Sequence, residues 1–397
     1  MRCEPVDGRL KVLLAITRMV PGGAQREVLQ LLSRLDRTRF HVSLVCNPGG
    51  EWVGQAAALA EAFHPLPDLV RPISPLRDVC ATATLTRLIR RERYDIVHAH
   101  TAKAGIVARV AAQLAGVPVV LHTPHGTVFH ECFLSPRMQQ TIVFLERVVA
   151  RRTSCILTKS VHETAEYVNR HIAPPGKFFT LYSGLDFSEL ARARNSPEAV
   201  RRALGIGLDQ PMVLYAARFV PEKSHESFLA AFRRVLAEMP RAVGVLAGDG
   251  PRRREIEALA ADLTAQGGLL SLGFRDDVAD LMRAADVCVS ASLTEGLPLA
   301  IVEALALGRP VAATDAGGTR EIVKHQGTGL LVPPGDSAAL AEAVLRLLRN
   351  PSLARQLGEQ GQLVAHSLFG VEAMIAKTAA LYEACWQQRH AAGCVAV

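Results

Sequence analysis

Two glutamates separated by seven residues are the part of this chain whose residue types and spacing point most directly to chemistry. Glu295 and Glu303 lie in segment 294–304, where Pro298 is placed to be the first residue of a helix, because that position needs no N–H. Helical rise would separate the two carboxylates by roughly 12 Å, the reach from a sugar ring to a ribose across a diphosphate. The free N–H groups and positive dipole end at 296–299 favour a nearby phosphate. The alternative is a capping glutamate and an ordinary helix carboxylate.

Histidines gather in the first half of the chain. His98 and His100 are two residues apart, so they share a face if both lie in a strand, and His122, His125 and His130 follow a second strand signal. Together they suggest a metal site, but no Asp or Glu ligand group accompanies them, and we predict no metal. For His98 a satisfied polar group in the core is the preferred interpretation.

These residues need a scaffold, and the pattern of short apolar runs predicts one. Apolar runs alternate with helical spacing, and glycine and proline breakers lie between them, which favours βαβ units and parallel sheets. The predicted strands cover residues 11–16, 41–46, 95–99, 117–122, 155–158, 212–216, 243–247, 269–272, 287–290 and 311–314.

The chain is long enough for two domains, and a connector with Ser-Gly and Ser-Pro breakers occupies residues 182–197. We therefore predict an α/β protein of two facing Rossmann-like domains, 1–182 and 183–370, with a helix at 371–397 that packs back on the first domain. Ligands bind at the carboxyl ends of parallel strands, so a site that closure can dry is expected between the domains.

Charge is unevenly distributed between the two halves. Residues 1–182 hold 23 Lys and Arg against 14 Asp and Glu, a net of +9, and the remaining residues hold 22 against 24, a net of −2. A basic half suits an anionic partner such as lipid head groups or a lipid diphosphate, although a solvated face without a partner is equally compatible. Nucleic acid is disfavoured, because the basic clusters carry no interleaved aromatics or recognition motif.

Cysteine spacing and hydropathy predict the compartment. The eight cysteines are scattered and form no CxxC pair, so we expect thiols in a reducing compartment rather than a disulfide framework or a zinc ribbon. No run reaches the ~18 apolar residues of a membrane span. The apolar run near the start is shorter than the about 7–15 residues of a signal peptide core. These features predict a cytoplasmic protein.

The segment around the glutamate pair resembles the glutamate–seven-residue–glutamate signature of glycosyltransferase family 4, retaining enzymes of the GT-B fold. It is preceded by residues 286–292 (Asp-Val-Cys-Val-Ser-Ala-Ser) and followed by 317–321 (Gly-Gly-Thr-Arg-Glu). The resemblance implies that Glu295 contacts the hydroxyls of the donor sugar and that Glu303 binds the ribose. With the other matching motifs, the resemblance covers nearly the whole chain.

The resemblance also assigns roles to cations. Arg218 and Lys223, in Ala-Arg-Phe-Val-Pro-Glu-Lys, match the family's diphosphate-binding pair. The chemistry suits this role, because the charge of a nucleoside diphosphate leaving group grows as the glycosidic bond breaks, and two cations stabilise that transition state. The glycine that usually follows the lysine is Ser224 here.

Other positions match by the same resemblance. His125 corresponds to the histidine near the reacting sugar, and the loop with Gly22 and Gly23 to the one that approaches the donor phosphates, where glycines permit a close approach and positive φ. The Gly22–Gly23 dipeptide could alternatively be a simple turn. The segment 247–251 with Gly248 resembles the family's glycine-rich turn after a strand, but alone it could be any tight turn. Phe274 is placed near the base by topology alone. The predicted donor site comprises Gly22, Gly23, Arg218, Lys223, Gly248, Phe274, Glu295, Gly296, Leu297, Pro298, Leu299 and Glu303, and the predicted catalytic residues are His125, Arg218, Lys223 and Glu295.

The sequence thus predicts a metal-independent, retaining hexosyltransferase without a cofactor. No Asp-x-Asp motif is present to form a metal clamp, which is the reason for expecting metal independence. The donor would be a nucleotide diphosphate-sugar, most simply a UDP-sugar. The resemblance to bacterial polysaccharide-assembly enzymes implies a glycan or lipid-linked acceptor held by the basic first domain, with peripheral membrane association. A nucleotide-sugar epimerase of related fold and a non-catalytic nucleotide-binding scaffold are the alternatives.

Overall fold

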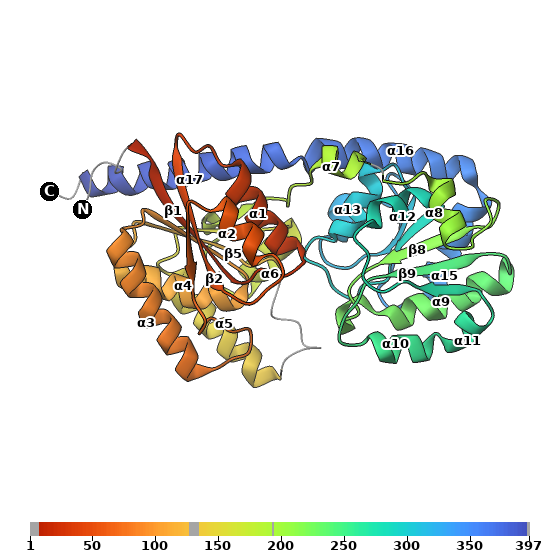
Figure 1. The fold of residues 1–397 in the computed structure, drawn as a ribbon, viewed down its shortest axis with the longest axis horizontal. Coiled ribbons are helices and arrows are strands. Elements are labelled where there is room, and N and C mark those ends of the chain that lie inside the picture. The colour runs from red at the N-terminus through yellow and green to blue at the C-terminus, as the bar shows by residue number, and fades with distance from the viewer. Residues whose placement is uncertain (1–7, 127–134, 193, 395–397) are drawn as a thin grey trace. The chain divides into compact units, whose positions relative to one another are not determined.

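The computed structural model describes residues 8–126, 135–192 and 194–394. Two compact units divide the chain: unit 1 comprises residues 1–184 and 371–397, and unit 2 comprises 185–370. The first unit therefore ends two residues beyond the predicted boundary. Figure 1 shows that each unit is a sheet covered by helices, and that the C-terminal helix α17 (Val371–Cys394) runs along unit 1.

Unit 1 is built on a parallel seven-stranded sheet with the order β3-β2-β1-β4-β5-β6-β7. Its central strands are buried along almost their whole length, because helices cover both faces. The strands are β1 (Leu10–Arg18), β2 (Phe40–Asn47), β3 (Ala62–Pro65), β4 (Ile96–His100), β5 (Val119–Thr123), β6 (Cys155–Thr158) and β7 (Phe178–Thr180).

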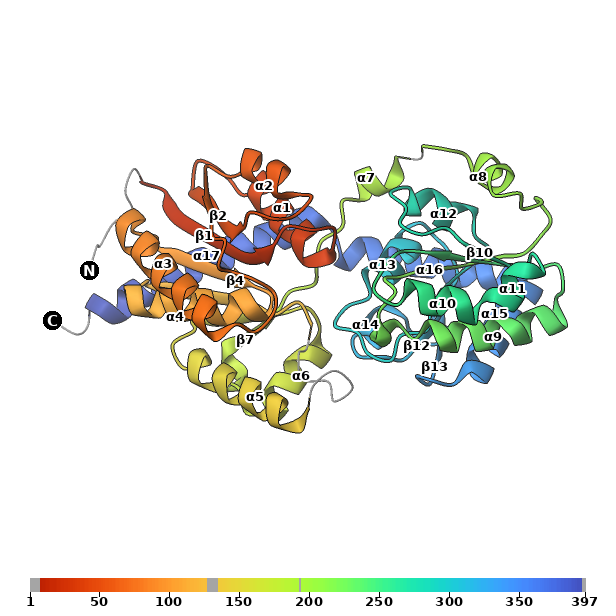
Figure 2. The ribbon, with the colours of Figure 1, turned by 60° about the horizontal axis from the view of Figure 1, so that its bottom comes forward.

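Helices form a layer on each face of this sheet (Figure 2). On one face α1 and α17 share a core with β1 and β2, to which Met374 and Tyr382 of α17 contribute, and the expected return of the last helix to the first unit is confirmed. On the other face α3 packs on α4, which contacts α5. The helices of unit 1 are α1 (Gly23–Arg34), α2 (Val53–Leu59), α3 (Pro75–Glu92), α4 (Ala102–Ala115), α5 (Pro136–Ala150), α6 (Val161–Asn169) and α17, with a 3₁₀ turn at Pro175–Lys177.

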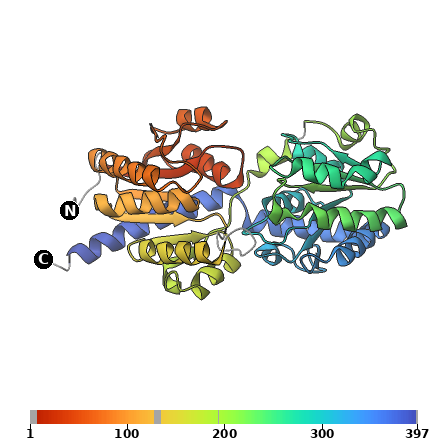
Figure 3. The same ribbon diagram turned by 90° about the horizontal axis from the view of Figure 1, so that it is seen from below.

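Unit 2 repeats the plan with a parallel six-stranded sheet in the order β10-β9-β8-β11-β12-β13. Figure 3 shows its helices on both sides of the sheet. The strands are β8 (Met212–Ala216), β9 (Val243–Ala247), β10 (Leu269–Ser271), β11 (Val287–Ser290), β12 (Val311–Thr314) and β13 (Leu330–Val332). The helices are α7 (Phe187–Ala191), α8 (Pro197–Ala203), α9 (His225–Glu238), α10 (Arg253–Leu259), α11 (Ala261–Ala265), α12 (Val278–Ala284), α13 (Leu299–Ala306), α14 (Thr319–Ile322), α15 (Ser337–Arg349) and α16 (Pro351–Leu368), with a 3₁₀ turn at Pro221–Lys223.

Each sheet has one point at which the strand order reverses. In unit 1 this point lies between β1 and β4, and in unit 2 between β8 and β11. At this point the chain segments that follow the two neighbouring strands run to opposite sides of the sheet. The loops at the carboxyl ends of these strands therefore separate, which leaves room for a ligand. These two points are where the residues predicted from the sequence must be sought.

Candidate active site

The reversal point of unit 2 brings together two of the predicted residues. Lys223 follows β8 and Glu295 follows β11, and the Lys223 ammonium forms an ion pair with the Glu295 carboxylate. The Ser292 hydroxyl donates to the same carboxylate oxygen at 2.7 Å. The glutamate side chain is only 9% exposed and the lysine 23%, so a cation and an anion face each other at the carboxyl edge of the sheet.

The backbone around this ion pair is held by neighbouring loops. The Tyr215 hydroxyl donates to the carbonyl of Lys223, and the N–H of Leu293 donates to the carbonyl of Glu222 at 2.8 Å. Ser224 adopts a left-handed conformation with φ 44°. Glycine adopts this conformation without a steric penalty, which is a physical reason for the glycine that is usual here.

Two glycines allow loops to approach closer than any side chain would permit. A Cβ on Gly317, whose φ is 54°, would lie 1.8 Å from the carbonyl oxygen of Glu295, and the N–H of Gly318 donates to that oxygen at 3.2 Å. A Cβ on Gly248, with φ 149°, would lie 2.0 Å from the carbonyl oxygen of Ala217. The glycine of the second loop therefore fixes the chain next to Arg218.

Helix α13 begins one residue later than the sequence predicts. Pro298 is the residue before the helix, with ψ 88°, and Leu299 is the first helical residue. Because Pro298 has no N–H, the donors nearest this helix end are those of Leu299 and the residues before it, Gly296 and Leu297. Glu303 is the fifth residue of the helix and is half-buried.

Arg218 and Phe274, two further residues of the predicted donor site, lie at the same edge and are more exposed than Lys223 and Glu295. Arg218 is exposed directly after β8. Phe274 follows β10, at the end strand of the sheet, and its side chain is 63% exposed. A solvent-facing aromatic ring can stack on a base, but the sheet order places two strands between β10 and the reversal point.

In unit 1 the Gly22–Gly23 loop differs from the expectation. Gly22 has φ 171° and precedes α1, and Gly23 is the first residue of that helix. Both conformations are accessible to residues with side chains, so the expectation of positive φ is wrong at this loop. A Cβ on Gly22 would lie 2.7 Å from the end of the Gln25 side chain and no closer than 3.9 Å to the carbonyl oxygen of Val20.

His125 lies in a constrained turn after β5. Its φ is 61°, and that of Gly126 is 117°. The N–H of Gly126 donates to the Glu163 carboxylate at 2.8 Å, which ties the turn to α6. Burial raises the pKa of Glu163 to about 7, although hydrogen bonds from the backbone of Lys159 and Gly126 lower it in part.

His125 is paired with His100, which ends β4. Nε2 of His125 lies 2.9 Å from Nδ1 of His100, so one nitrogen donates and the other accepts. Burial lowers the pKa of both imidazoles, and the Lys159 ammonium lowers both further. The pair therefore remains neutral at physiological pH.

Sequence reasoning missed a carboxylate beside these histidines. Glu27 of α1 has an oxygen within 4.8 Å of ligand nitrogens of both His100 and His125, so the expectation that no acidic group accompanies the histidines is wrong. Glu27 pairs with Lys159, which follows β6, at 2.7 Å, and both side chains are under 5% exposed. The Ser183 hydroxyl donates to the other oxygen of Glu27 at 3.1 Å. We call these five residues the unit 1 cluster.

The remaining histidines belong to the core. Both ring nitrogens of His98 have partners, the Tyr382 hydroxyl and the Thr123 hydroxyl, each at 2.7 Å, which confirms the preferred interpretation of this residue. The Nδ1–H of His122 donates to the carbonyl of Ala99 at 3.0 Å. His130 lies outside the described residues.

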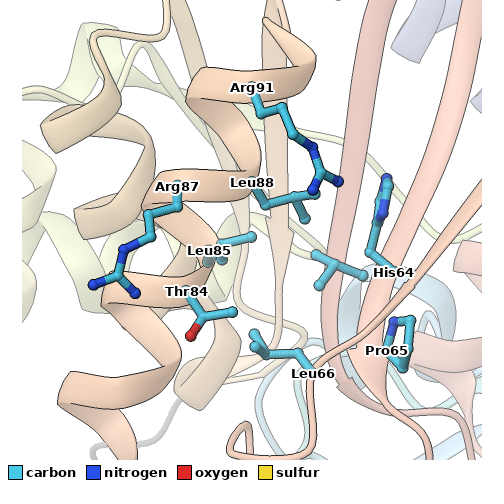
Figure 4. Close-up of a pocket in the computed structure, with 9 residues that line it drawn as sticks. His64, Pro65, Leu66, Thr84, Leu85, Arg87, Leu88 and Arg91 are labelled. Carbon is cyan, nitrogen blue, oxygen red and sulfur yellow. The ribbon is translucent and has the colours of Figure 1, made fainter.

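Unit 1 also has an open hollow between α3 and the strands β2 and β3. Figure 4 shows its apolar floor, which includes Leu66, Leu85 and Leu88, and two arginines, Arg87 and Arg91, at its rim. Its volume is about 360 Å³. None of the predicted site residues lines it, so it is separate from the unit 1 cluster.

Comparison with known proteins identifies the class to which this fold and these residues belong. Residues 197–364 match the family model described as "Glycosyl transferases group 1", and residues 22–184 match "Glycosyl transferase 4-like domain". The first match lies in unit 2 and the second in unit 1. The chain is therefore a glycosyltransferase of the GT-B fold and of the family 4 type, an enzyme that transfers a sugar from a nucleotide sugar.

Individual relatives agree with this assignment. The UDP-Gal:alpha-D-GlcNAc-diphosphoundecaprenol alpha-1,3-galactosyltransferase of Escherichia coli is 30% identical over 344 residues, which are 85% of this chain and 88% of the relative. D-inositol 3-phosphate glycosyltransferase of Thermobispora bispora is 29% identical over 315 residues, 75% of this chain and 72% of the relative. Among solved structures, Anabaena HepE in complex with UDP and glucose aligns with a TM-score of 0.80 at 22% identity, covering 94% of this chain and 100% of the other.

Proposed function

We propose that this glycosyltransferase is a retaining, metal-independent enzyme that transfers a hexose from a UDP-sugar to a lipid-linked glycan during synthesis of a cell-surface polysaccharide. The observation that carries the proposal is the ion pair of Lys223 with Glu295 at the reversal point of unit 2, where Arg218 lies in the same loop after β8. Unit 2 would bind the donor and unit 1 the acceptor. The UDP complexes of HepE and the E. coli relative's UDP-galactose donor support uridine as the nucleoside of the donor.

The ion pair suits a site that exchanges partners when the donor binds. In the free protein Glu295 neutralises Lys223, so neither charge is left uncompensated. When a diphosphate arrives, the lysine and Arg218 turn to the phosphate oxygens, and the freed carboxylate accepts hydroxyls of the donor sugar. The Ser292 hydroxyl, 2.7 Å from Glu295, keeps that carboxylate in place through the exchange.

The transfer itself needs no dedicated base on the protein. The bond between the anomeric carbon and the diphosphate oxygen breaks, and the acceptor oxygen forms its bond on the same face of the sugar. The proton of the acceptor hydroxyl passes to the departing diphosphate oxygen. Arg218 and Lys223 stabilise the negative charge that grows on the leaving group, which is the work a divalent cation performs in other transferases.

The unit 1 cluster also favours metal independence. Glu27 is the carboxylate that a cation beside His100 and His125 would use, but Lys159 already neutralises it at 2.7 Å. A divalent ion there would leave about two uncompensated positive charges in a buried place, which is costly.

Membrane association of unit 1 is the remaining part of the proposal, and α5 supports it. This helix buries polar residues and exposes apolar ones: Gln139 and Glu146 are buried, whereas Phe144 is 63% exposed and Val148 43%. Phe144 and Val148 are four residues apart, so they form one stripe on the outer face. No described helix is both long and apolar enough to cross a membrane.

The charges of the same segment are complementary to an anionic surface. The exposed arginines at 137, 147, 151 and 152 have no exposed acidic neighbour within residues 135–152, because Glu146 is buried. A helix with an exposed apolar stripe between cations lies at the boundary of head groups and acyl chains. We therefore place α5 against the inner face of the membrane, where a lipid-linked acceptor would be found.

The donor part is tested by calorimetric titration of UDP, GDP and ADP in EDTA. We expect selective binding of UDP, a loss of on the order of 2–5 kcal/mol in Lys223→Ala, and no loss in Arg241→Ala. Arg241 is an exposed cation before β9, at the opposite edge of the same sheet. Binding that is indifferent to Lys223 would refute the phosphate site. Turnover of the sugar nucleotide without an acceptor would favour an epimerase.

The membrane part is tested by sedimentation with vesicles. We expect wild type to bind vesicles that contain phosphatidylglycerol and Phe144→Ser/Val148→Ser to bind at least about tenfold less. Leu363→Ser is the matched control, because Leu363 of α16 in unit 2 is 65% exposed. Equal binding of the double variant, or a change in oligomeric state instead of vesicle binding, contradicts this assignment of α5.

A further inference from the structure

The buried pair of Glu27 and Lys159 has no counterpart in the donor chemistry proposed above. Its members are 132 residues apart in the chain, come from α1 and from the end of β6, and meet at 2.7 Å. Burying an ion pair removes water from both charged groups, which costs free energy. A buried pair at the carboxyl edge of a sheet, rather than in its core, therefore calls for a functional explanation.

The two residues face the histidine pair. An oxygen of Glu27 lies within 4.8 Å of ligand nitrogens of His100 and His125, and the Lys159 ammonium acts electrostatically on both imidazoles. A lone carboxylate there would attract a proton to the histidines, and a lone ammonium would repel one. In the pair the Lys159 ammonium lowers the pKa of both imidazoles, and the Glu27 carboxylate opposes this effect.

From these contacts, and resting on the proposed transfer reaction with His125 near the reacting sugar, as the family resemblance implies, we propose that Glu27 and Lys159 are positioning residues, which act through the hydrogen-bonded pair of His100 and His125. Glu27 holds the start of α1 against the turn, and Lys159 holds the end of β6. Together they keep the two imidazoles in one arrangement with a single proton between them. Ser183 fixes the second oxygen of Glu27 at 3.1 Å.

A neutral His125 matters because of the charge that develops on the donor. The sugar gains positive charge at the anomeric carbon as its bond to the diphosphate breaks, and a nearby imidazolium would oppose that charge. The neutral form, held in one tautomer by His100, can instead hydrogen-bond to the sugar without penalty. Protonation of the histidine pair should therefore slow transfer.

All ionisable groups that face the pair point to the same conclusion. His98 on β4 and His122 on β5 are buried imidazoles of lowered pKa, and Glu163 of α6 binds the backbone of the turn rather than either ring. The Tyr382 hydroxyl of α17 is hydrogen-bonded to His98. Glu27 is thus the one described carboxylate beside the imidazoles, and Lys159 the one described ammonium.

The test is a set of variants with opposite expected shifts. Lys159→Met leaves Glu27 unopposed about 5 Å from the imidazoles, and should move the acidic limb of the kcat/KM profile upward by roughly two pH units. Below this raised limb kcat/KM should fall about tenfold for each pH unit, relative to the variant's own plateau. Glu27→Gln should move the limb downward, and the double variant should return it near its original position.

Two further measurements keep the proposal falsifiable if Lys159→Met folds poorly. Lys159→Arg preserves the charge and should restore the wild-type limb, and histidine ring signals followed by NMR should titrate with the same shifts without any substrate. Variants that lower activity equally at every pH would mean a purely structural pair and overturn the proposal. Retention of stoichiometric Zn²⁺ after dialysis against EDTA would overturn it too, because Glu27 would then be a metal ligand. Histidine shifts in a protein that binds no UDP would refute the proposed function instead.

Discussion

The buried ion pair of Arg109 and Glu146 allows a sharp prediction about how unit 1 holds α5 in place. The Nη2 of Arg109 donates to both oxygens of Glu146 at 2.7 Å, and the side chains are 0% and 2% exposed. Nε of Arg109 donates to the carbonyl of Gly105 within α4. This pair and the hydrogen bond from the Gln113 side chain to the carbonyl of Val149 at 2.9 Å are polar contacts between α4 and α5, and the buried pair turns the apolar stripe of α5 outward.

The size of the effect follows from burial. Replacing Glu146 by leucine leaves a guanidinium without its counter-charge in a dry contact, and removing one partner of a buried pair costs about 3–5 kcal/mol. Replacing both residues, in Arg109→Met/Glu146→Leu, removes the uncompensated charge together with the pair, and such exchanges are often close to neutral. The coupling energy of the two positions should therefore be about 3 kcal/mol or more.

Urea unfolding followed by tryptophan fluorescence measures the unfolding free energy of unit 1 in each variant, because both tryptophans, Trp52 and Trp386, belong to that unit. The matched control is the exposed pair of Arg39 and Glu383, with side chains 46% and 34% exposed, for which Glu383→Ala should cost no more than about 1 kcal/mol. If Glu146→Leu costs as little as this control, α5 is not held by the buried pair, and the explanation of its outward apolar face fails.

Three other predictions concern the two candidate sites. Because the pKa of Glu163 is raised from 4.5 to about 7, the folded state binds the proton more tightly than the unfolded state. Wild type should therefore lose up to about 3 kcal/mol of unfolding free energy as pH rises from 4.5 to above 7, and Glu163→Gln should not; parallel urea-stability profiles would contradict this. Gly317→Ala should weaken UDP binding strongly, whereas Gly335→Ala, whose φ is also positive but whose Cβ meets nothing within 4 Å, should not; equal titrations would show that the clash with Glu295 is relieved harmlessly. Ser292→Ala should cost about 1 kcal/mol of donor binding by calorimetry, and an unchanged affinity would mean that its hydrogen bond to Glu295 is lost in the complex.

The apolar runs of the sequence were sufficient to predict the positions of the inner strands. Cys155–Thr158, Met212–Ala216 and Val311–Thr314 begin and end where the runs do, because strands buried on both faces must be apolar throughout. The short end strands β3, β7 and β13 were not predicted. They are paired on one side only, so their three or four residues carry little hydrophobic pattern.

The sequence predicted Lys223 and Glu295, through the family resemblance and the chemistry of their side chains. Residue types and their spacing along the chain, which phosphate and sugar recognition need, are local properties of a sequence. What the sequence could not contain is which distant side chains share a buried space. Glu27 meets Lys159, and Arg109 meets Glu146, only because parallel strands and their helices return to the same edge or layer. A charge is compensated by whatever folding brings within a few ångströms, and that distance is decided by the tertiary structure alone.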